Sequence, residues 1–205
     1  MLEFIESDHI YLKNGILVKS VTQILQLIFP DKYKNIDKRI LNKKATFGTR
    51  GHSIIEHLNL DDTEDVDKSI LSIDNKDLEI CIREYVRLVK TFKITPLEQE
   101  IRVSYKYLYA GTLDMIADID DKYSLCDIKF TAELDKEYLS WQLGMYALAK
   151  GVEFDKYYCI WLKKGCLGKL VEITPKNKNE IINMLKKVGI INERNMERYW
   201  WIWNY

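Results

Sequence analysis

The chain has 205 residues, of which 47% are hydrophobic, and this size and composition fit one well-packed domain rather than two large ones. Lysine plus arginine and aspartate plus glutamate each total 31, so the formal net charge of zero excludes a global basic surplus for binding nucleic acid. Acidic residues interrupt the first apolar stretch, and no apolar run approaches the roughly 20 residues needed to span a bilayer. We therefore expect a single intracellular domain over residues 1–205 with no membrane contact.

A β-hairpin and a capped helix are expected first. Asn14 and Gly15 separate two apolar stretches and tolerate the positive φ angles of a two-residue turn. Ser20 and Gln23 fit a capping box at the start of the next helix. The lysine-rich run over residues 32–44 then fits either a solvated helix face or a patch that faces phosphate groups.

Two further helices follow, with an acidic segment between them. Residues 47–60, FGTRGHSIIEHLNL, carry their isoleucines and leucines on one helical stripe. Residues 60–67 are acidic and predict a surface loop or lid. Residues 77–92 predict the clearest amphipathic helix, because apolar side chains recur there at three- and four-residue spacing.

The second half of the chain changes to strand patterns. We expect strands over 98–105, 113–119 and 123–130, a helix over 135–150, a hairpin over 156–173, and a helix from Thr174-Pro175 to about residue 188. The final segment, NERNMERYWWIWNY, is dense in aromatic residues. Packing onto the domain is favoured for it over a base-stacking or partner-binding surface.

Four scattered cysteines offer no metal signature. Cys81, Cys126, Cys159 and Cys166 form no CxxC pair of the kind that marks zinc or redox sites. We expect free thiols that mostly fill core positions.

The strand pair over residues 113–130 places charged side chains where a buried strand favours apolar ones. A turn centred on Asp120 and Asp121 puts Asp114 opposite Asp127, and a register slip of two residues puts it opposite Lys129. Residues two apart on a strand share a face, so Asp114, Asp127 and Lys129 converge in either register. Opposed carboxylates repel each other, and something must compensate.

Two compensations fit the residues. Lys129 can neutralise the carboxylates as a structural ion pair. Alternatively, a hard divalent cation such as Mg²⁺ or Mn²⁺ binds between them, since clustered carboxylate oxygens are its natural ligands. Two carboxylates and a lysine are also the groups needed for metal-assisted hydrolysis of a phosphodiester.

Other residues supply candidate partners for this site. Glu100 lies at the start of the preceding expected strand, where Glu98 is its rival. His52 lies in the helix behind the sequence GTRG, whose glycines allow close approach of another element, and His57 is its rival. Gln142 and Tyr146 are four residues apart and share a helix face.

These motifs carry a resemblance. GTLD, then DIK with its aspartate 13 residues after that of GTLD, then QLGMY resemble the GxxD, DxK and QxxxY motifs of RecB-like nucleases in the PD-(D/E)XK superfamily. The stretch GTRGH is similar to the upstream GxxxH element of that family. The match runs from Gly48 to Tyr146, and the compact size resembles phage-encoded and CRISPR-associated exonucleases. The clustered cysteines that hold an iron–sulfur cluster in many CRISPR-associated members are absent.

The resemblance implies a metal site. Asp114 and Asp127 would bind Mg²⁺ or Mn²⁺, joined by the carbonyl oxygen of Ile128. His52 would be a further metal ligand, and Glu100 matches an acidic position ahead of GxxD.

The resemblance also implies an activity. Lys129 would be catalytic together with Asp114 and Asp127, and Gln142 and Tyr146 would support the site and contact the DNA strand. The expected protein is a cytoplasmic metal-dependent deoxyribonuclease, an exonuclease at DNA ends, in the host cytoplasm if the chain is phage-encoded. Its expected partners are DNA and a protein of a recombination, replication or repair pathway.

The expected fold is an α/β domain with a mixed central β-sheet flanked by helices, a PD-(D/E)XK restriction-endonuclease-like core, and the metal site at one edge of the sheet. The alternative function is a catalytically silent RecB-like domain that binds DNA or a protein partner. An RNA substrate is a third possibility.

Overall fold

The protein is described by a computed structural model that covers residues 1–6, 10–60 and 66–192. The strands are β1 Leu2–Ile5, β2 Ile10–Lys13, β3 Ile16–Ser20, β4 Ile94–Tyr105, β5 Tyr109–Ile119, β6 Tyr123–Lys129, β7 Lys156–Trp161 and β8 Lys169–Glu172. The helices are α1 Val21–Ile28, α2 Lys38–Leu60, α3 Val66–Leu71, α4 Lys76–Phe92, α5 Lys136–Lys150 and α6 Lys178–Lys187. The predicted α/β class is confirmed.

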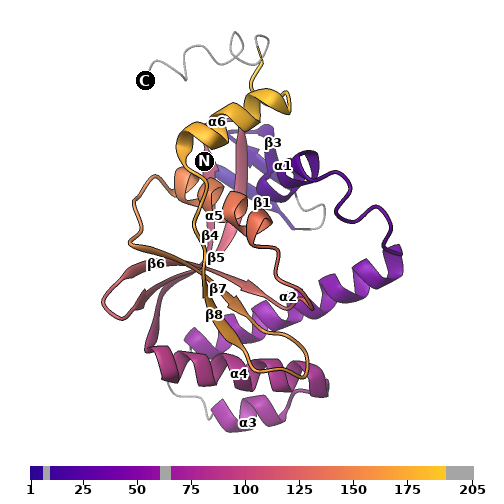
Figure 1. The fold of residues 1–205 in the computed structure, drawn as a ribbon, viewed down its shortest axis with the longest axis vertical. Coiled ribbons are helices and arrows are strands. Elements are labelled where there is room, and N and C mark those ends of the chain that lie inside the picture. Colours follow the sequence, from indigo (N-terminus) through magenta and orange to yellow (C-terminus); the bar gives the residue numbers. More distant parts are fainter. Residues whose placement is uncertain (7–9, 61–65, 193–205) are drawn as a thin grey trace.

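A mixed eight-stranded sheet forms the middle layer. Its order is β1-β2-β3-β5-β6-β7-β8, with β4 paired to β5. The pairs β3·β5 and β6·β7 are parallel, and the others are antiparallel. One core lies between the sheet and α1, α5 and α6, and a second lies between the sheet and α2, α3 and α4, so helices cover both faces (Figure 1).

Local sequence signals explain several boundaries. Asn14 and Gly15 have φ angles of 48° and 75°, and Asp120 and Asp121 have 55° and 57°. Two consecutive positive φ angles define the tight turn whose twist matches a β-hairpin, as predicted for both pairs. The predicted capping box of Ser20 and Gln23 also opens α1.

Of the two registers that the sequence allowed, the one with the turn centred on Asp120 and Asp121 is confirmed. Met115 pairs with Cys126 and Asp118 with Tyr123, while Ile119 and Lys122 exchange backbone hydrogen bonds of 3.0 and 3.2 Å. The same register continued by one pair brings Asp114 beside Asp127.

The sheet separates at Asp114. On the side of β5 away from β4, β3 pairs with residues 109–110 and β6 with residues 115–118. Residues 111–114 of β5 therefore have no strand partner on this side, because β3 pairs before them and β6 pairs after them. The metal site was expected at an edge of the sheet. Asp114 and Asp127 belong to β5 and β6, which lie inside the strand order, whereas Glu100 belongs to β4, which pairs with β5 alone.

The start of α6 also differs from the prediction. The helix begins at Lys178 with Asn177 as its N-cap, not at Thr174-Pro175. Backbone groups of Thr174 and Lys176 instead hydrogen-bond to Ser140 on α5, at 2.6 and 2.9 Å. These tertiary bonds hold the segment outside the helix, and they outweigh the preference of proline for a first helical turn.

Three of the four cysteines are buried, and all four are free thiols, as predicted. The acidic segment around residues 61–65 and the aromatic segment over 193–205 lie outside the described residues. Among the helices that the structure describes, none is both long and apolar enough to cross a membrane.

Candidate functional site

Three candidate ligands meet from three different elements. His52 on α2, Glu100 on β4 and Asp114 on β5 each offer one atom, and these atoms all lie within 4.8 Å of one another. The Nδ1 atom of His52 is 3.8 Å from Oδ2 of Asp114, too long for a hydrogen bond but within reach of a shared cation. An imidazole and two carboxylates therefore converge on one point.

The carboxylate of Asp114 is oriented by a backbone hydrogen bond from β6. The backbone N–H of Ile128 donates to Oδ2 of Asp114 over 2.7 Å. The side chain of Ile128 is buried in the core on the α4 side of the sheet. Ile128 thus holds the Asp114 carboxylate through its amide, and the ligand role of its carbonyl stays a prediction.

Glu100 has an unusual backbone. Its φ angle is 47°, in the left-handed region that a residue with a side chain adopts at a cost of about 1 kcal/mol or more. The residue is exposed as a whole, but atoms close around its carboxyl group. This desolvation, followed by the negative charge of Asp114, raises the pKa of Glu100 to about 7.

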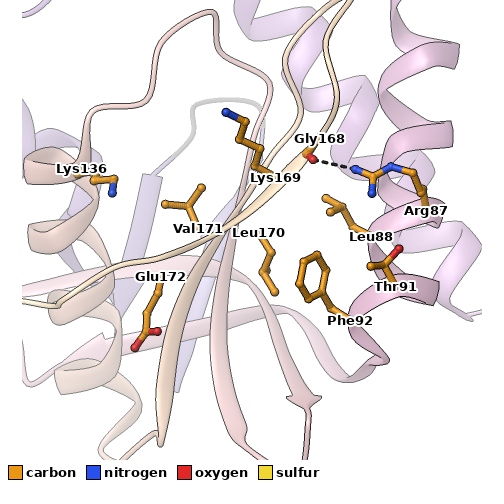
Figure 2. Close-up of a pocket in the computed structure, with 10 residues that line it drawn as sticks. All are labelled: Arg87, Leu88, Thr91, Phe92, Lys136, Gly168, Lys169, Leu170, Val171 and Glu172. Atoms are coloured by element: carbon orange, nitrogen blue, oxygen red, sulfur yellow. Dashed lines mark hydrogen bonds between the residues drawn. The ribbon is translucent and has the colours of Figure 1, made fainter.

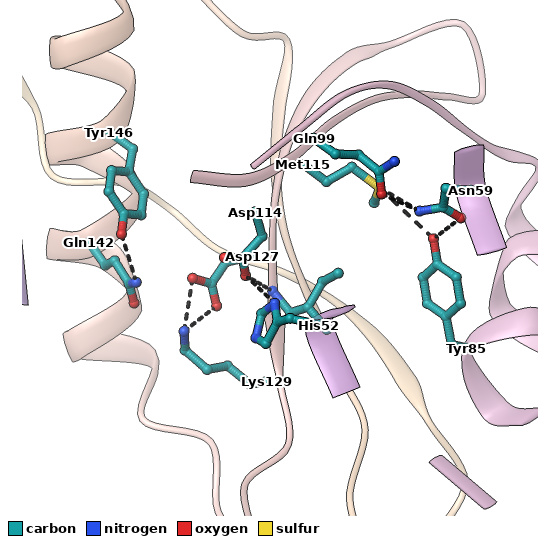
Figure 3. Close-up of polar contacts among 11 residues, drawn as sticks. His52, Asn59, Tyr85, Gln99, Asp114, Met115, Asp127, Lys129, Gln142 and Tyr146 are labelled. Carbon is teal, nitrogen blue, oxygen red and sulfur yellow. Dashed lines mark hydrogen bonds and ion pairs between the residues drawn. The ribbon is translucent and has the colours of Figure 1, made fainter. Parts of the chain in front are cut away.

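A polar network beside Glu100 was not predicted. Asn59 of α2 donates to Gln99 Oε1 over 2.6 Å and accepts from the Tyr85 hydroxyl over 2.8 Å (Figure 3). These bonds tie α2, α4 and β4 together next to the cluster. The seven-residue spacing of His52 and Asn59 places both on one face of α2 and was the available signal.

Asp127 and Lys129 form a pair next to Asp114. Lys129 Nζ donates to Oδ1 of Asp127 over 2.9 Å and lies 2.7 Å from Oδ2, which itself accepts no hydrogen bond from the described residues. Asp127 is only 1% exposed. It is not one of the three residues whose ligand atoms lie within 4.8 Å of one another.

Burial and charge act in opposite directions on this pair. Burial raises the pKa of Asp127 to about 6, although the ammonium of Lys129 opposes the rise. Burial also works to lower the pKa of Lys129, but the charges of Asp127 and Asp114 outweigh it and raise that pKa above its usual range. Lys129 therefore carries its positive charge at neutral pH.

Gln142 and Tyr146 lie on α5 above the site. Both are buried, and Gln142 Nε2 donates to the Tyr146 hydroxyl over 3.4 Å. A Cβ atom at Gly111 would lie 2.7 Å from the Tyr146 ring, so the glycine lets this ring approach β5. Their burial favours a supporting role over direct contact with a DNA strand.

The rival residues lie elsewhere. Glu98 pairs with Lys150 over 2.8 Å, and His57 is exposed on α2. Neither belongs to the group of ligand atoms found among the described residues.

One of the two glycines before His52 permits close packing. A Cβ atom at Gly51 would lie 2.3 to 2.8 Å from the ring atoms of Phe130, which follows Lys129 and packs against Phe47 and His52. A Cβ atom at Gly48 would meet nothing within 4 Å. Close approach, expected for both glycines, holds for Gly51.

We expect Gly51→Ala to lower the free energy of unfolding by about 1–2 kcal/mol, because the added methyl must displace the Phe130 ring. Gly48→Ala is the matched control in the same helix, and it should raise the free energy of unfolding by about 0.5–1 kcal/mol through helix propensity. Urea denaturation followed by circular dichroism measures both. Equal effects of the two substitutions would contradict this packing.

Comparisons with known proteins give one loose structural likeness. No protein-family model and no curated protein sequence matches this chain. A solved structure titled "Crystal structure of SSO0001" is similar with a TM-score of 0.46 and 16% identity, over 83% of this chain and 74% of that chain. A likeness this loose carries no argument about the site.

Proposed function

We propose that this protein is a metal-dependent deoxyribonuclease of the RecB-like PD-(D/E)XK type, an exonuclease acting at DNA ends. The observation that carries the proposal is the meeting of His52, Glu100 and Asp114 beside the Asp127–Lys129 pair. Ligands for a cation on α2, β4 and β5 then lie beside a charged lysine on β6, as metal-assisted phosphodiester hydrolysis needs. The mixed sheet with helices on both faces is compatible with a restriction-endonuclease-like core.

The residues present fit a divalent cation. His52, Glu100 and Asp114 supply one nitrogen and two carboxylate donors, while Oδ2 of Asp127 is engaged by Lys129 Nζ at 2.7 Å. Carboxylates suit Mg²⁺ and Mn²⁺, and an imidazole favours the softer Mn²⁺. A bound cation would polarise the phosphate and lower the pKa of a bound water.

The residues of the chain have distinct parts in this proposal. The Asp127 carboxylate fixes the Lys129 ammonium, which can orient the attacking water and stabilise the charge that develops on the phosphate oxygens. The Ile128 amide and the Asn59–Gln99 bond keep Asp114 and the strand of Glu100 in place.

DNA must bind through local positive groups, since the net charge is zero. Candidates are the basic run over 32–44, Lys163-Lys164 and Lys186-Lys187. Lys32 itself is engaged with Asp135 and lies over the Tyr138 ring at 4.1 Å. Binding through such clusters should weaken steeply as salt rises.

The direct test is cleavage of end-labelled DNA with Mg²⁺, with Mn²⁺ and with a chelator. Linear and circular substrates separate an exonuclease from an endonuclease, and an RNA substrate tests the third possibility. Shortening of linear DNA that requires the metal supports the proposal. No cleavage of any substrate with either metal would overturn it and favour the silent binding module.

Replacing His52 should change the metal requirement. We expect His52→Ala to raise the Mn²⁺ concentration for half-maximal cleavage about 10- to 100-fold, because one donor of the cluster is lost. His52→Asp exchanges nitrogen for oxygen and should increase the rate with Mg²⁺ relative to Mn²⁺. His57→Ala, on the exposed face of the same helix, is the control and should behave as wild type.

A further inference from the structure

A row of side chains crosses the sheet next to Lys129. Lys129 of β6 is the Cα partner of Trp161 on β7, and Trp161 is the partner of Lys169 on β8. Partners on neighbouring strands project from the same face. Because strands lie about 4.8 Å apart, the row extends about 10 Å from the candidate catalytic lysine toward the β8 edge.

Trp161 is held in one orientation and stays partly open. Its indole Nε1–H donates to the carbonyl oxygen of Thr131 over 2.8 Å, which ties the ring to the segment after Phe130. The residue is half-buried against the α5 side of the sheet, which leaves part of its ring in contact with solvent.

Two ammonium groups flank this ring. Lys163 Nζ lies 6.0 Å and Lys169 Nζ 5.8 Å from the ring centroid. Among the described residues, no carboxylate lies within ion-pair distance of either lysine, whereas Lys32 and Lys129 are each paired with an aspartate. The exposed part of the indole ring can stack on a base, and the two ammonium groups that form no ion pair can contact phosphates. These groups match a nucleotide strand, in which bases alternate with phosphates.

The positive surface continues along the free edge of β8. A groove of about 550 Å³ lies there, and Lys136 and Lys169 face it from the α5 side of the strand (Figure 2). Arg87 lines it from α4 but is engaged with Glu84 and the Gly168 carbonyl. The acidic Glu172 stands at the other end, where Lys156 pairs with it over 2.6 Å.

We propose that Trp161, Lys163 and Lys169 form a binding subsite for single-stranded DNA, leading from the candidate active site toward the edge of the sheet. This rests on the proposed nuclease function. An unpaired strand is the form of DNA that fits, because bases in a duplex are stacked on each other and cannot present a face to the indole.

The test measures binding without catalysis. Fluorescence anisotropy of a labelled oligothymidine with the full chain and a chelator gives the dissociation constant at several salt concentrations. We expect Trp161→Leu to raise that constant at least about fivefold, and Trp161→Phe to change it less than about twofold, since a ring remains for stacking. Thermal unfolding of each variant checks that it is folded.

The lysines have a separate readout. Lys163→Gln and Lys169→Gln should each lower the slope of log affinity against log salt by about 0.7, one phosphate contact on a single strand, and Trp161→Leu should leave the slope unchanged. Lys19→Gln, an exposed lysine on β3, is the control and should change neither quantity.

Several results would overturn the subsite. These are no binding of oligothymidine by the wild type, wild-type affinity in Trp161→Leu, unchanged salt slopes in both lysine variants, or equally tight binding of duplex DNA or oligouridine. If Trp161→Leu does not fold, the salt slopes of Lys163→Gln and Lys169→Gln alone test the subsite. Loss of cleavage with intact Trp161-dependent binding would instead overturn only the nuclease proposal.

Discussion

Asp114→Asn should lower metal-dependent cleavage about 1000-fold or more, while the protein stays folded. The substitution removes one of the two carboxylate charges of the cluster, and the electrostatic contribution of a catalytic metal amounts to several kcal/mol. The asparagine keeps an oxygen that can accept the 2.7 Å hydrogen bond from the Ile128 amide. Stability should therefore change by less than about 1 kcal/mol. Initial cleavage rates and thermal unfolding measure the two effects.

Asp118→Asn is the matched control for this experiment. Asp118 lies on the same strand and accepts a hydrogen bond from the Asp121 amide at 3.1 Å, outside the cluster. We expect wild-type cleavage rates for it. If Asp114→Asn cleaves DNA as fast as Asp118→Asn, Asp114 is not a metal ligand and the proposed mechanism fails.

Lys129→Met should reduce both activity and stability. Cleavage should fall about 100- to 1000-fold, because the positioned positive charge is lost. Stability should fall by about 2 kcal/mol, since the buried Asp127 carboxylate is left without its partner; the side chain of Lys129 is 25% exposed, so solvent reduces the usual cost of breaking a buried pair. Cleavage assays and urea denaturation measure these losses.

The double variant Asp127→Asn/Lys129→Met separates the two effects. With the charge at position 127 also removed, at least half of the lost stability should return, because no unpaired buried charge remains. Cleavage should stay at the level of the single variant or below. Recovery of cleavage together with stability would show that Lys129 acts only by holding the fold.

Local rules in the sequence predicted much of the scaffold. Face alternation left two registers for β5 with β6, and the structure confirms the one with Asp120 and Asp121 in the turn. The capping box at Ser20 and Gln23 also follows from neighbouring residues alone. These features depend on hydrogen bonds and side-chain directions within a few residues, so a linear reading captures them.

Other features depend on distant parts of the chain. The start of α6 is set by bonds of Thr174 and Lys176 to Ser140 on another helix. The Asn59–Gln99–Tyr85 network likewise arises only where β4 packs against α2 and α4, and no local signal marks the left-handed backbone of Glu100. A pattern of neighbouring residues carries no information about such contacts, and hydrogen bonds between distant elements can override local helix preferences.

The sequence by itself determined that Asp114, Asp127 and Lys129 share one face of a hairpin, because a strand alternates its side chains with a period of two. Only the tertiary structure decided which groups meet there. It brings Asp114 close to His52 and Glu100 and pairs Asp127 with Lys129. It also places the site at the part of β5 that lies between its pairing with β3 and its pairing with β6. The physical reason is that distances between separate elements are set by how their cores pack, and no spacing along the chain encodes them.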